Sequence, residues 1–230
     1  MAYQQSFKRY ELKYLITVPQ KEKLLKVLEP YMKLDEYGKS EIRNIYFDND
    51  SFRLIRNSID KPLYKEKLRV RSYGRPKEDE PVFVEIKKKY NHIVYKRRIK
   101  MPEIAAKEIL KSNDNLPQDT QISREIDYFR KLYGPLTPKV FLCYDREAYY
   151  TIEPSDFRIT FDDNIKYRLD NLELNSDSSG TKILPDDKVL MEVKTSTSIP
   201  LWLAHFLSEE HIYKTSFSKY GTAYGGFYNV

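Results

Sequence analysis

The stretch KLRVRSYG (residues 67–74) alternates basic and apolar side chains. Successive side chains of a β-strand point to opposite faces of the sheet. The alternation therefore predicts a strand with Lys67, Arg69 and Arg71 on one face and apolar residues on the other. For a single strand, a charged face turned to water is an ordinary explanation. The other predicted strands decide whether these cations have a further purpose.

Most of the other predicted strands divide in the same way. In YELKYLI (10–16) Glu11 and Lys13 share one face, and in VLMEVKTS (189–196) Glu192 and Lys194 do so. A charged face is also predicted for the runs PVFVEIKKK (81–89), VYKRRIK (94–100), CYDREAY (143–149) and FRITFDD (157–163). These faces are dominated by Arg and Lys rather than by the mixture of Ser, Thr, Gln, Lys and Glu that is typical of a solvated face.

Four amphipathic segments are predicted to be helices: residues 18–32, 101–111, 123–134, with Ser123 as N-cap, and 200–210. Such helices need an apolar surface to cover, so we expect them outside the sheet, with the charged strand faces pointing inward. A long antiparallel sheet tends to curl, and closing it removes its edges. The predicted fold class is therefore α+β, an antiparallel β-barrel with helices packed outside. The Gly-rich segment 220–226 is expected to be a flexible tail.

Composition sets broad limits on the class of protein. The 230 residues are 40% hydrophobic and contain no evident repeat or linker, so we expect one domain over residues 1–230. The net charge of +6 weakly favours an anionic partner. The single cysteine, Cys143, cannot form an internal disulfide, and we expect a cytoplasmic protein without a zinc site.

Two further classes are disfavoured by the sequence. No apolar run approaches the roughly 20 residues needed to cross a bilayer, so membrane attachment is expected only through a partner protein that the sequence does not reveal. The P-loop motif GxxxxGK[ST] is absent, which argues against an ATP site of that type.

A lumen lined with cations predicts a polyanionic ligand, because confined like charges and their desolvation are costly without counterions. On this basis, replacing Arg69 and Arg71 is expected to relieve repulsion and raise stability. Glu-x-Lys occurs at 11–13, 85–87 and 192–194, each time on an inward face. One such pair alone is ordinary ion-pair material. Three of them indicate a site for a hard divalent cation whose shell is completed by phosphates.

An ordered set of segments resembles the VTC polyphosphate polymerase domain, a branch of the CYTH/triphosphate tunnel metalloenzymes. The segments are YELKYLI, IYFDND (45–50), KLRVRSYG, VFVEIKKK (82–89), CYDREAY, FRITFDD, MEVK (191–194) and FSKYG (217–221). The resemblance covers nearly the whole chain. It implies a tunnel barrel of roughly eight antiparallel strands with helices outside, in agreement with the alternation of the strand faces.

The resemblance also implies roles for matching positions. Catalytic, triphosphate-binding cations fall on Lys13, Arg69, Arg71, Lys87, Lys96, Arg146, Arg158 and Lys219. Additional substrate contacts fall on Arg56, Arg98, Tyr144 and Lys194. The metal-binding glutamate falls on Glu192, with Glu11 and Glu85 as supporting acids, and the metal is Mn²⁺ or Mg²⁺. Ser216 stands where some relatives carry another lysine, a departure that bears on turnover and substrate choice rather than on the fold.

The function that the resemblance favours is synthesis of polyphosphate from a nucleoside triphosphate such as ATP, with polyphosphate or pyrophosphate as further ligands. A triphosphatase would bind the phosphates with the same basic residues and differs in using water as the acceptor. A noncatalytic module that binds polyphosphate or RNA is a third possibility. RNA readers usually add exposed aromatic side chains that stack on bases, and most tyrosines here alternate onto apolar faces. We therefore expect no specific nucleic-acid partner.

A polymerase must also bind the growing chain beyond the site of transfer. Basic residues are therefore predicted to continue toward one mouth of the tunnel. The candidates are Lys88, Lys89, Lys100 and Lys214.

Overall fold

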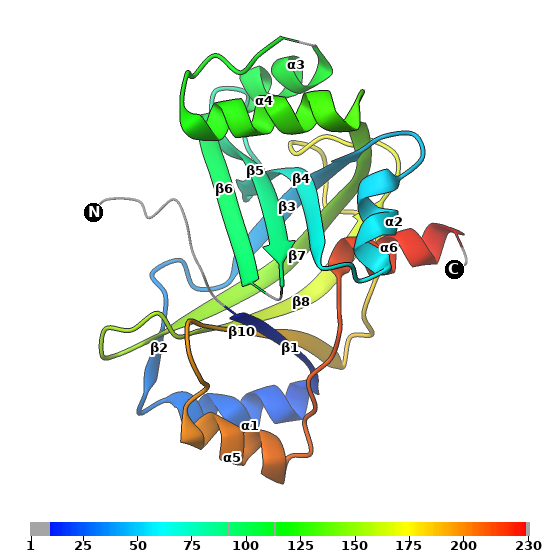
Figure 1. Ribbon diagram of the computed structural model, residues 1–230. Coiled ribbons are helices and arrows are strands. Elements are labelled where there is room, and N and C mark those ends of the chain that lie inside the picture. Colours follow the sequence, from blue (N-terminus) through cyan, green and yellow to red (C-terminus); the bar gives the residue numbers. More distant parts are fainter. Residues whose placement is uncertain (1–9, 92, 113, 229–230) are drawn as a thin grey trace.

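The computed structural model describes residues 10–91, 93–112 and 114–228. Within these residues an antiparallel sheet of ten strands has the order β1-β10-β8-β7-β3-β4-β5-β6, with β2 beside β7 and β9 beside β8 (Figure 1). The strands are β1 (Tyr10–Thr17), β2 (Met32–Leu34), β3 (Ser40–Asp48), β4 (Tyr64–Tyr73), β5 (Pro81–Tyr90), β6 (Ile93–Pro102), β7 (Thr137–Thr151), β8 (Arg158–Arg168), β9 (Thr181–Lys182) and β10 (Lys188–Thr195). The predicted α+β class with an antiparallel sheet is confirmed.

Six helices accompany the sheet in the described part of the chain, and none is long and apolar enough to cross a membrane. They are α1 (Val18–Leu28), α2 (Arg53–Ile59), α3 (Glu103–Lys111), α4 (Gln121–Tyr133), α5 (Leu201–Glu209) and α6 (Lys219–Tyr228). In Figure 1, α3 and α4 lie at one end of the molecule, α1 and α5 at the opposite end, and α2 beside α6.

The four predicted helices are present, but three details differ from prediction. The N-cap of α4 is Thr120, whose hydroxyl accepts from the Ser123 backbone, so Ser123 is the third helical residue and completes the capping box. Helix α2 was not predicted because it has only seven residues, too few for a periodic signal. The prediction of a flexible Gly-rich tail is wrong: residues 220–226 belong to α6, where Tyr220 and Ala223 are buried against the sheet.

Helix packing explains why the charged faces point inward. Leu68, Val84 and Ile86 on the apolar face of β4 and β5 are fully or almost fully buried in one cluster with Ile126 and Phe129 of α4. A second cluster joins the apolar faces of β1, β8 and β10 to α1 and α5. Each fully buried side chain of this size contributes roughly 1.5–3 kcal/mol. Turning the basic face outward would forfeit this burial.

Strand register aligns the inward-facing residues into rows. Glu85 on β5 lies directly between Arg69 on β4 and Arg98 on β6. At the other end of the sheet, Lys13 on β1 lies opposite Glu192 on β10. The register therefore sets acids beside bases across neighbouring strands.

The two ends of the sheet meet through side chains. The described residues show no backbone ladder between β1 and β6. Lys87 on β5 nevertheless reaches Glu11 on β1, with 2.5 Å between Nζ and Oε2. The curled sheet is thus held together across its opening by an ion pair, and its inward face surrounds a cavity.

Candidate functional site

The cavity inside the curled sheet has a volume of about 2070 Å³. Its lining contains 17 Lys and Arg side chains and four Asp and Glu side chains. Because like charges in a confined space raise one another's energy, this excess of positive charge favours anionic ligands.

Glu85 is a buried anchor for the cations of one half of the cavity. Its side chain is 0% exposed, with Arg69 Nη2 at 2.8 Å, Lys96 Nζ at 2.7 Å and Arg98 Nη1 at 4.0 Å from its carboxylate. Burial alone would raise the pKa of Glu85, but Arg69, Arg71 and Lys96 hold this pKa far below its usual range. Glu85 therefore remains ionised and fixes the direction of the cations that lie in front of it.

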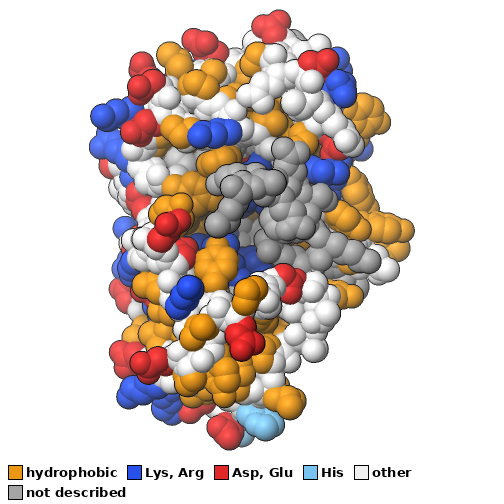
Figure 2. Space-filling model, turned by 90° about the vertical axis from the view of Figure 1, so that its left-hand side faces the viewer, with side chains coloured by type: hydrophobic (Ala, Val, Ile, Leu, Met, Phe, Trp, Pro, Cys, Tyr) orange, Lys and Arg blue, Asp and Glu red, His pale blue; other side chains and the backbone are white. Residues whose placement is uncertain are grey.

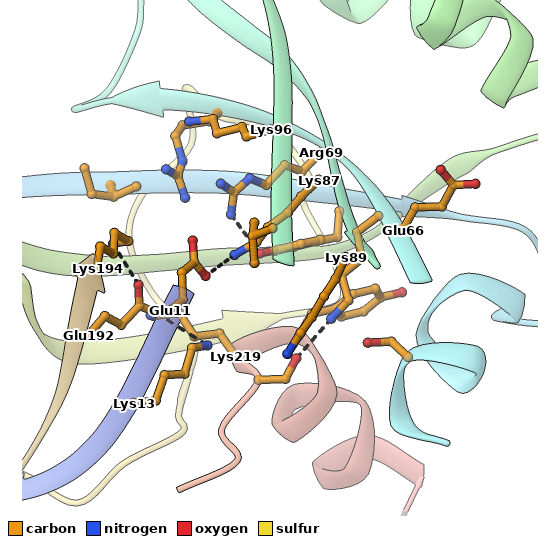
Figure 3. Close-up of a pocket in the computed structure, with 18 of the residues that line it drawn as sticks. Glu11, Lys13, Glu66, Arg69, Lys87, Lys89, Lys96, Glu192, Lys194 and Lys219 are labelled. Atoms are coloured by element: carbon orange, nitrogen blue, oxygen red, sulfur yellow. Dashed lines mark hydrogen bonds and ion pairs between the residues drawn. The ribbon is translucent and has the colours of Figure 1, made fainter. Parts of the chain in front are cut away.

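Asp162 and Glu192 anchor the cations of the other half. Arg146 Nε and Nη2 donate to the two carboxylate oxygens of Asp162, at 2.6 and 2.7 Å. Lys219, from α6, lies 2.5 Å from Asp162 and 3.3 Å from Glu192. The cations within 4 Å of Glu192 are Lys13, Arg146, Lys194 and Lys219. Figure 3 shows the side chains of Lys13, Lys194 and Lys219 converging on Glu192 from three separate elements.

Neutral side chains orient two of the guanidinium groups. Arg71 Nε donates to Asn44 Oδ1 at 2.9 Å, and its Nη2 donates to the hydroxyl of Tyr144 at 3.0 Å. Arg69 Nη1 donates to the hydroxyl of Tyr46 at 3.1 Å. These contacts with neutral groups fix the direction of both guanidinium groups and do not themselves cancel positive charge.

Several cavity lysines have altered pKa values. Burial lowers the pKa of Lys96 to about 7, although Glu85 opposes this effect. Burial likewise lowers the pKa of Lys194 to about 7 against the opposing effect of Glu192, and it lowers the pKa of Lys67 well below its usual range. For Lys219, the carboxylates of Asp162 and Glu192 outweigh burial and raise the pKa. A bound polyanion would favour the protonated form of every one of these amines.

The structure brings most of the predicted site residues together. Those that line the cavity are Glu11, Lys13, Arg69, Arg71, Lys87, Lys96, Arg98, Tyr144, Arg146, Arg158, Glu192, Lys194 and Lys219. Glu85 does not line the cavity itself, but its carboxylate contacts Arg69 and Lys96, which do. Arg56 is placed differently from prediction: it is exposed on α2, whose buried positions are Leu54, Ile55 and Ser58, and it does not line the cavity.

The predicted basic track is also only partly correct. Lys89, Lys100 and Lys214 line the cavity. Lys88 does not, because neighbouring residues on a strand face opposite ways, and its Nζ lies 3.6 Å from Glu125 on α4.

Sequence reasoning gave no role to several residues of the site. Asp162 belongs to the run FRITFDD, for which a charged face is predicted, but the pattern does not mark it as an anchor. Lys65 continues the row of Lys67, Arg69 and Arg71 by one more alternate position, so the period of two could have identified it. Asn44 and Tyr46 carried no comparable signal, since their strand has buried residues on both faces.

The acidic residues permit only one kind of metal site. Within residues 10–91, 93–112 and 114–228, no three His, Cys, Asp or Glu side chains lie close enough together to hold a metal ion. Magnesium typically takes one or two carboxylates while substrate phosphates complete its shell. Glu192 lies close enough to Glu11 for its charge to oppose the ionisation of Glu11, and this pair fits a divalent cation that binds together with phosphates. Glu85 does not fit, because its carboxylate is fully buried and does not line the cavity.

Comparisons with known proteins agree with this fold. The family model of the VTC domain matches residues 8–228. A provisionally assigned adenylate cyclase from Bacillus halodurans has a similar structure, with a TM-score of 0.59 and 16% identity over 94% of this chain and 96% of that chain. A provisionally assigned adenylyl cyclase from Hippeastrum, for which a dominant triphosphatase activity is described, gives a TM-score of 0.56 and 16% identity over 96% of both chains. At this identity the likeness concerns the fold alone. No curated protein matches the sequence.

Proposed function

This chain belongs to the VTC domain family, and from that premise we propose that it is a metal-dependent phosphoryl transferase that makes polyphosphate from a nucleoside triphosphate. The observation that supports this most directly is the placement of three buried acidic anchors on two sides of the cavity. Glu85 on one side and Asp162 with Glu192 on the other hold arginines and lysines from both halves of the sheet around one cavity.

Phosphoryl transfer needs this kind of environment. The transferred group carries its charge on three equatorial oxygens, so catalysis consists mainly of positioning and electrostatic stabilisation. Arg69, Arg71 and Arg146 are already oriented by hydrogen bonds and need little rearrangement when phosphates bind. In the proposed reaction, a terminal oxygen of the acceptor chain bonds to the γ-phosphorus of the donor, and the bond to the β-phosphate oxygen breaks. A nucleoside diphosphate leaves.

A divalent cation held by Glu192, with Glu11 beside it, would neutralise charge on the phosphate oxygens when bound. The protein residues perform the rest. Lys13, Lys194 and Lys219 keep the carboxylate of Glu192 directed into the cavity. The cavity volume of about 2070 Å³ exceeds the roughly 300–1,000 Å³ of an ordinary small-molecule site, which leaves space for an acceptor chain beside the donor.

A triphosphatase is the second candidate, and one observation favours it. Lys87, Lys96 and Arg98 remain 34%, 24% and 24% exposed, so water reaches the phosphate clamp. The Hippeastrum protein of similar fold is described with that activity. A noncatalytic polyanion-binding module is less well supported, because the carboxylates of Glu11 and Glu192 reduce affinity for anions and serve a metal-dependent reaction better than simple anion binding.

One experiment separates these functions. Purified protein is incubated with ATP and either Mn²⁺ or Mg²⁺, and orthophosphate and polyphosphate are quantified together. Polyphosphate on a stained gel, with nucleoside diphosphate formed in step, supports the polymerase. Orthophosphate in equal amount to nucleoside diphosphate, without any chain, identifies a triphosphatase. Tight binding of ATP without turnover identifies the noncatalytic module.

A further inference from the structure

Lys67, on the inward face of β4, lines the cavity without a charged partner. Its Nζ donates to the Ser218 hydroxyl at 3.0 Å. In the part of the chain that the structure describes, no carboxylate oxygen lies within 4.0 Å of this amine. Lys87, directly opposite on β5, has Glu11 at 2.5 Å. The sheet therefore sets a lysine with a counterion beside one that has none.

The surroundings of Lys67 disfavour the charged form of its amine. Burial is the largest cause that holds the pKa of Lys67 well below its usual range, and four positive neighbours add to the effect: Lys13, Lys65, Lys87 and Arg69. The Ser218 hydroxyl also accepts from the backbone N–H of Gly221 at 3.1 Å, so the amine lies at the positive N-terminal end of α6. A neutral amine has a free electron pair and is a nucleophile.

Two other cavity lysines also have a lowered pKa but differ in their partners. Burial lowers the pKa of Lys96 to about 7, and its Nζ lies 2.7 Å from Glu85. Burial lowers the pKa of Lys194 to about 7 as well, and its Nζ lies 3.1 Å from Glu192. A carboxylate at such a distance favours the protonated amine. Of these three lysines, Lys67 is therefore the strongest candidate for a nucleophile.

A phosphate-binding group is held beside this amine. Arg69 lies two residues further along the same face of β4, about 7 Å away along the strand. Its guanidinium carbon lies 5.9 Å from the ring centroid of Tyr46. The Lys67 amine lies 5.7 Å from the ring centroid of Tyr220. These two rings stack on each other, with 4.8 Å between their centroids, and so keep the amine and the guanidinium on one wall of the cavity.

A molecule with a phosphate bonded to an electrophilic carbon can use both groups. In an acyl phosphate the phosphate is the leaving group, and it gains negative charge as its bond to the acyl carbon breaks. The cations around Lys67 would bind this phosphate and stabilise the charge that it gains. A phosphorylated aldehyde would profit less, because its phosphate does not leave when an amine attacks the carbonyl carbon.

Selectivity among amines distinguishes such a site from general reactivity. Figure 2 shows Lys and Arg side chains scattered over the outside of the molecule, so an acylating reagent meets many other amines. An unperturbed lysine has a pKa of about 10.4, so fewer than about one such amine in a thousand is neutral near pH 7. A desolvated amine among phosphate-binding cations should therefore react ahead of exposed ones.

We propose that Lys67 is a site of covalent acylation by acyl phosphates, and that the modification weakens anion binding in the cavity. The electron pair of the amine forms a bond to the acyl carbon, and the bond from that carbon to the phosphate oxygen breaks. Orthophosphate leaves with the electron pair of that bond and takes up the proton that the amine loses. The product is an amide, which does not become protonated when a polyanion binds. This site depends on the amine and the cavity and not on the proposed polymerase function.

The test treats purified protein at neutral pH with acetyl phosphate and, in parallel, with acetic anhydride, which carries no phosphate. Peptide mass spectrometry follows acetylation of Lys67 and of three exposed lysines that do not line the cavity: Lys33, Lys111 and Lys131. Both reactions are repeated with tripolyphosphate present. Calorimetry then measures tripolyphosphate binding by treated and untreated wild-type protein and by Lys67→Arg, which keeps a positive charge at this position. Thermal melting checks that the variant is folded.

With acetyl phosphate, Lys67 should be acetylated at least about tenfold faster than the exposed lysines, since its neutral fraction and the local concentration of the anionic reagent are both higher. This preference should shrink with acetic anhydride. Tripolyphosphate should slow the reaction at Lys67 by about tenfold or more, because it fills the cavity and favours the protonated amine. Treatment should lower the tripolyphosphate affinity of wild-type protein by about threefold or more, and it should leave the affinity of Lys67→Arg unchanged.

Three results would overturn the acylation site. The first is acetylation of Lys67 no faster than that of the exposed lysines. The second is the same preference with acetic anhydride, which would show a reactive amine without a phosphate site. The third is faster acetylation of Lys96 or Lys194 than of Lys67. Acetylated Lys67 with unchanged tripolyphosphate affinity would refute the effect on binding. If the protein proves to have no polymerase activity, the mass-spectrometric comparison still decides the site.

Discussion

Arg69 lies 2.8 Å from the carboxylate of Glu85, which is completely buried. Removing Arg69 therefore has two opposing effects. It relieves repulsion among the cavity cations, and it leaves the buried negative charge of Glu85 with fewer partners. The second effect is the larger, because breaking a buried ion pair by removing one partner typically costs 3–5 kcal/mol. The expectation that the cavity arginines destabilise the protein through repulsion overlooked this anchor.

Arg69→Ala should lower the free energy of unfolding by roughly 3 kcal/mol and weaken tripolyphosphate binding. Lys67→Ala, on the same face of the same strand, removes a cation that has no carboxylate partner among the described residues. Its free energy of unfolding should stay the same or rise. Urea unfolding of both variants measures the difference, and equal destabilisation would show that Glu85 is not the reason.

Glu192→Gln should abolish metal-dependent turnover and preserve or strengthen tripolyphosphate binding, because the change removes a metal-binding charge and no phosphate-binding one. The matched control is Asp162→Asn, which removes a buried acid that binds Arg146 and Lys219 but does not line the cavity. That variant should lose stability and keep its dependence on metal concentration. If Glu192→Gln loses stability and retains turnover, Glu192 is only an ion-pair partner of the lysines around it.

Affinity for tripolyphosphate should fall as the pH rises above about 7. In the free protein, burial lowers the pKa of Lys96 to about 7 from 10.5, with Glu85 opposing and Arg71 and Arg69 adding to the decrease. A bound anion favours the protonated amine, so binding above pH 7 must take up a proton. One such group changes the dissociation constant by up to about tenfold per pH unit. Lys96→Arg, which keeps its charge at every pH used, should flatten the profile.

The lowered pKa of Lys96 has the opposite effect on folding: the stability of the ligand-free protein rises with pH, whereas its affinity for tripolyphosphate falls. Between about pH 7 and pH 10 the unfolded chain holds a proton on Lys96 that the folded, ligand-free protein lacks, so this group makes the folded state more stable as the pH rises. Chemical unfolding of wild-type protein and Lys96→Arg at several pH values isolates the contribution. A free energy of unfolding of the wild-type protein that falls relative to that of Lys96→Arg as the pH rises would contradict the assigned pKa.

Chelation of divalent cations should stop turnover without changing the melting temperature of the ligand-free protein. The reason is that no three potential metal-binding side chains come together in residues 10–91, 93–112 and 114–228, so no metal is expected to hold the fold. Thermal melting with and without a chelator, followed by the same comparison with tripolyphosphate present, measures this. A large drop in melting temperature on chelation alone would reveal a structural metal.

The alternation of residues determined the inward face of the sheet. Because successive side chains of a strand point in opposite directions, the apolar positions of residues 67–74 fixed where Lys67, Arg69 and Arg71 lie once α4 covered Leu68. The same rule separates Lys89, which lines the cavity, from Lys88, which does not. Most of the candidate site was predictable for this local reason, and the family resemblance assigned roles to the matching positions.

Only the tertiary structure decided which charges compensate one another. Glu11 and Lys87 are 76 residues apart and meet because the sheet curls. Lys219 reaches Asp162 because α6, rather than a flexible tail, packs against the sheet. Arg56 does not line the cavity, because a short helix turns it toward solvent. An alternating pattern specifies the face on which a side chain lies, but pairing energies depend on distances between segments, and those distances are set by how the whole sheet closes.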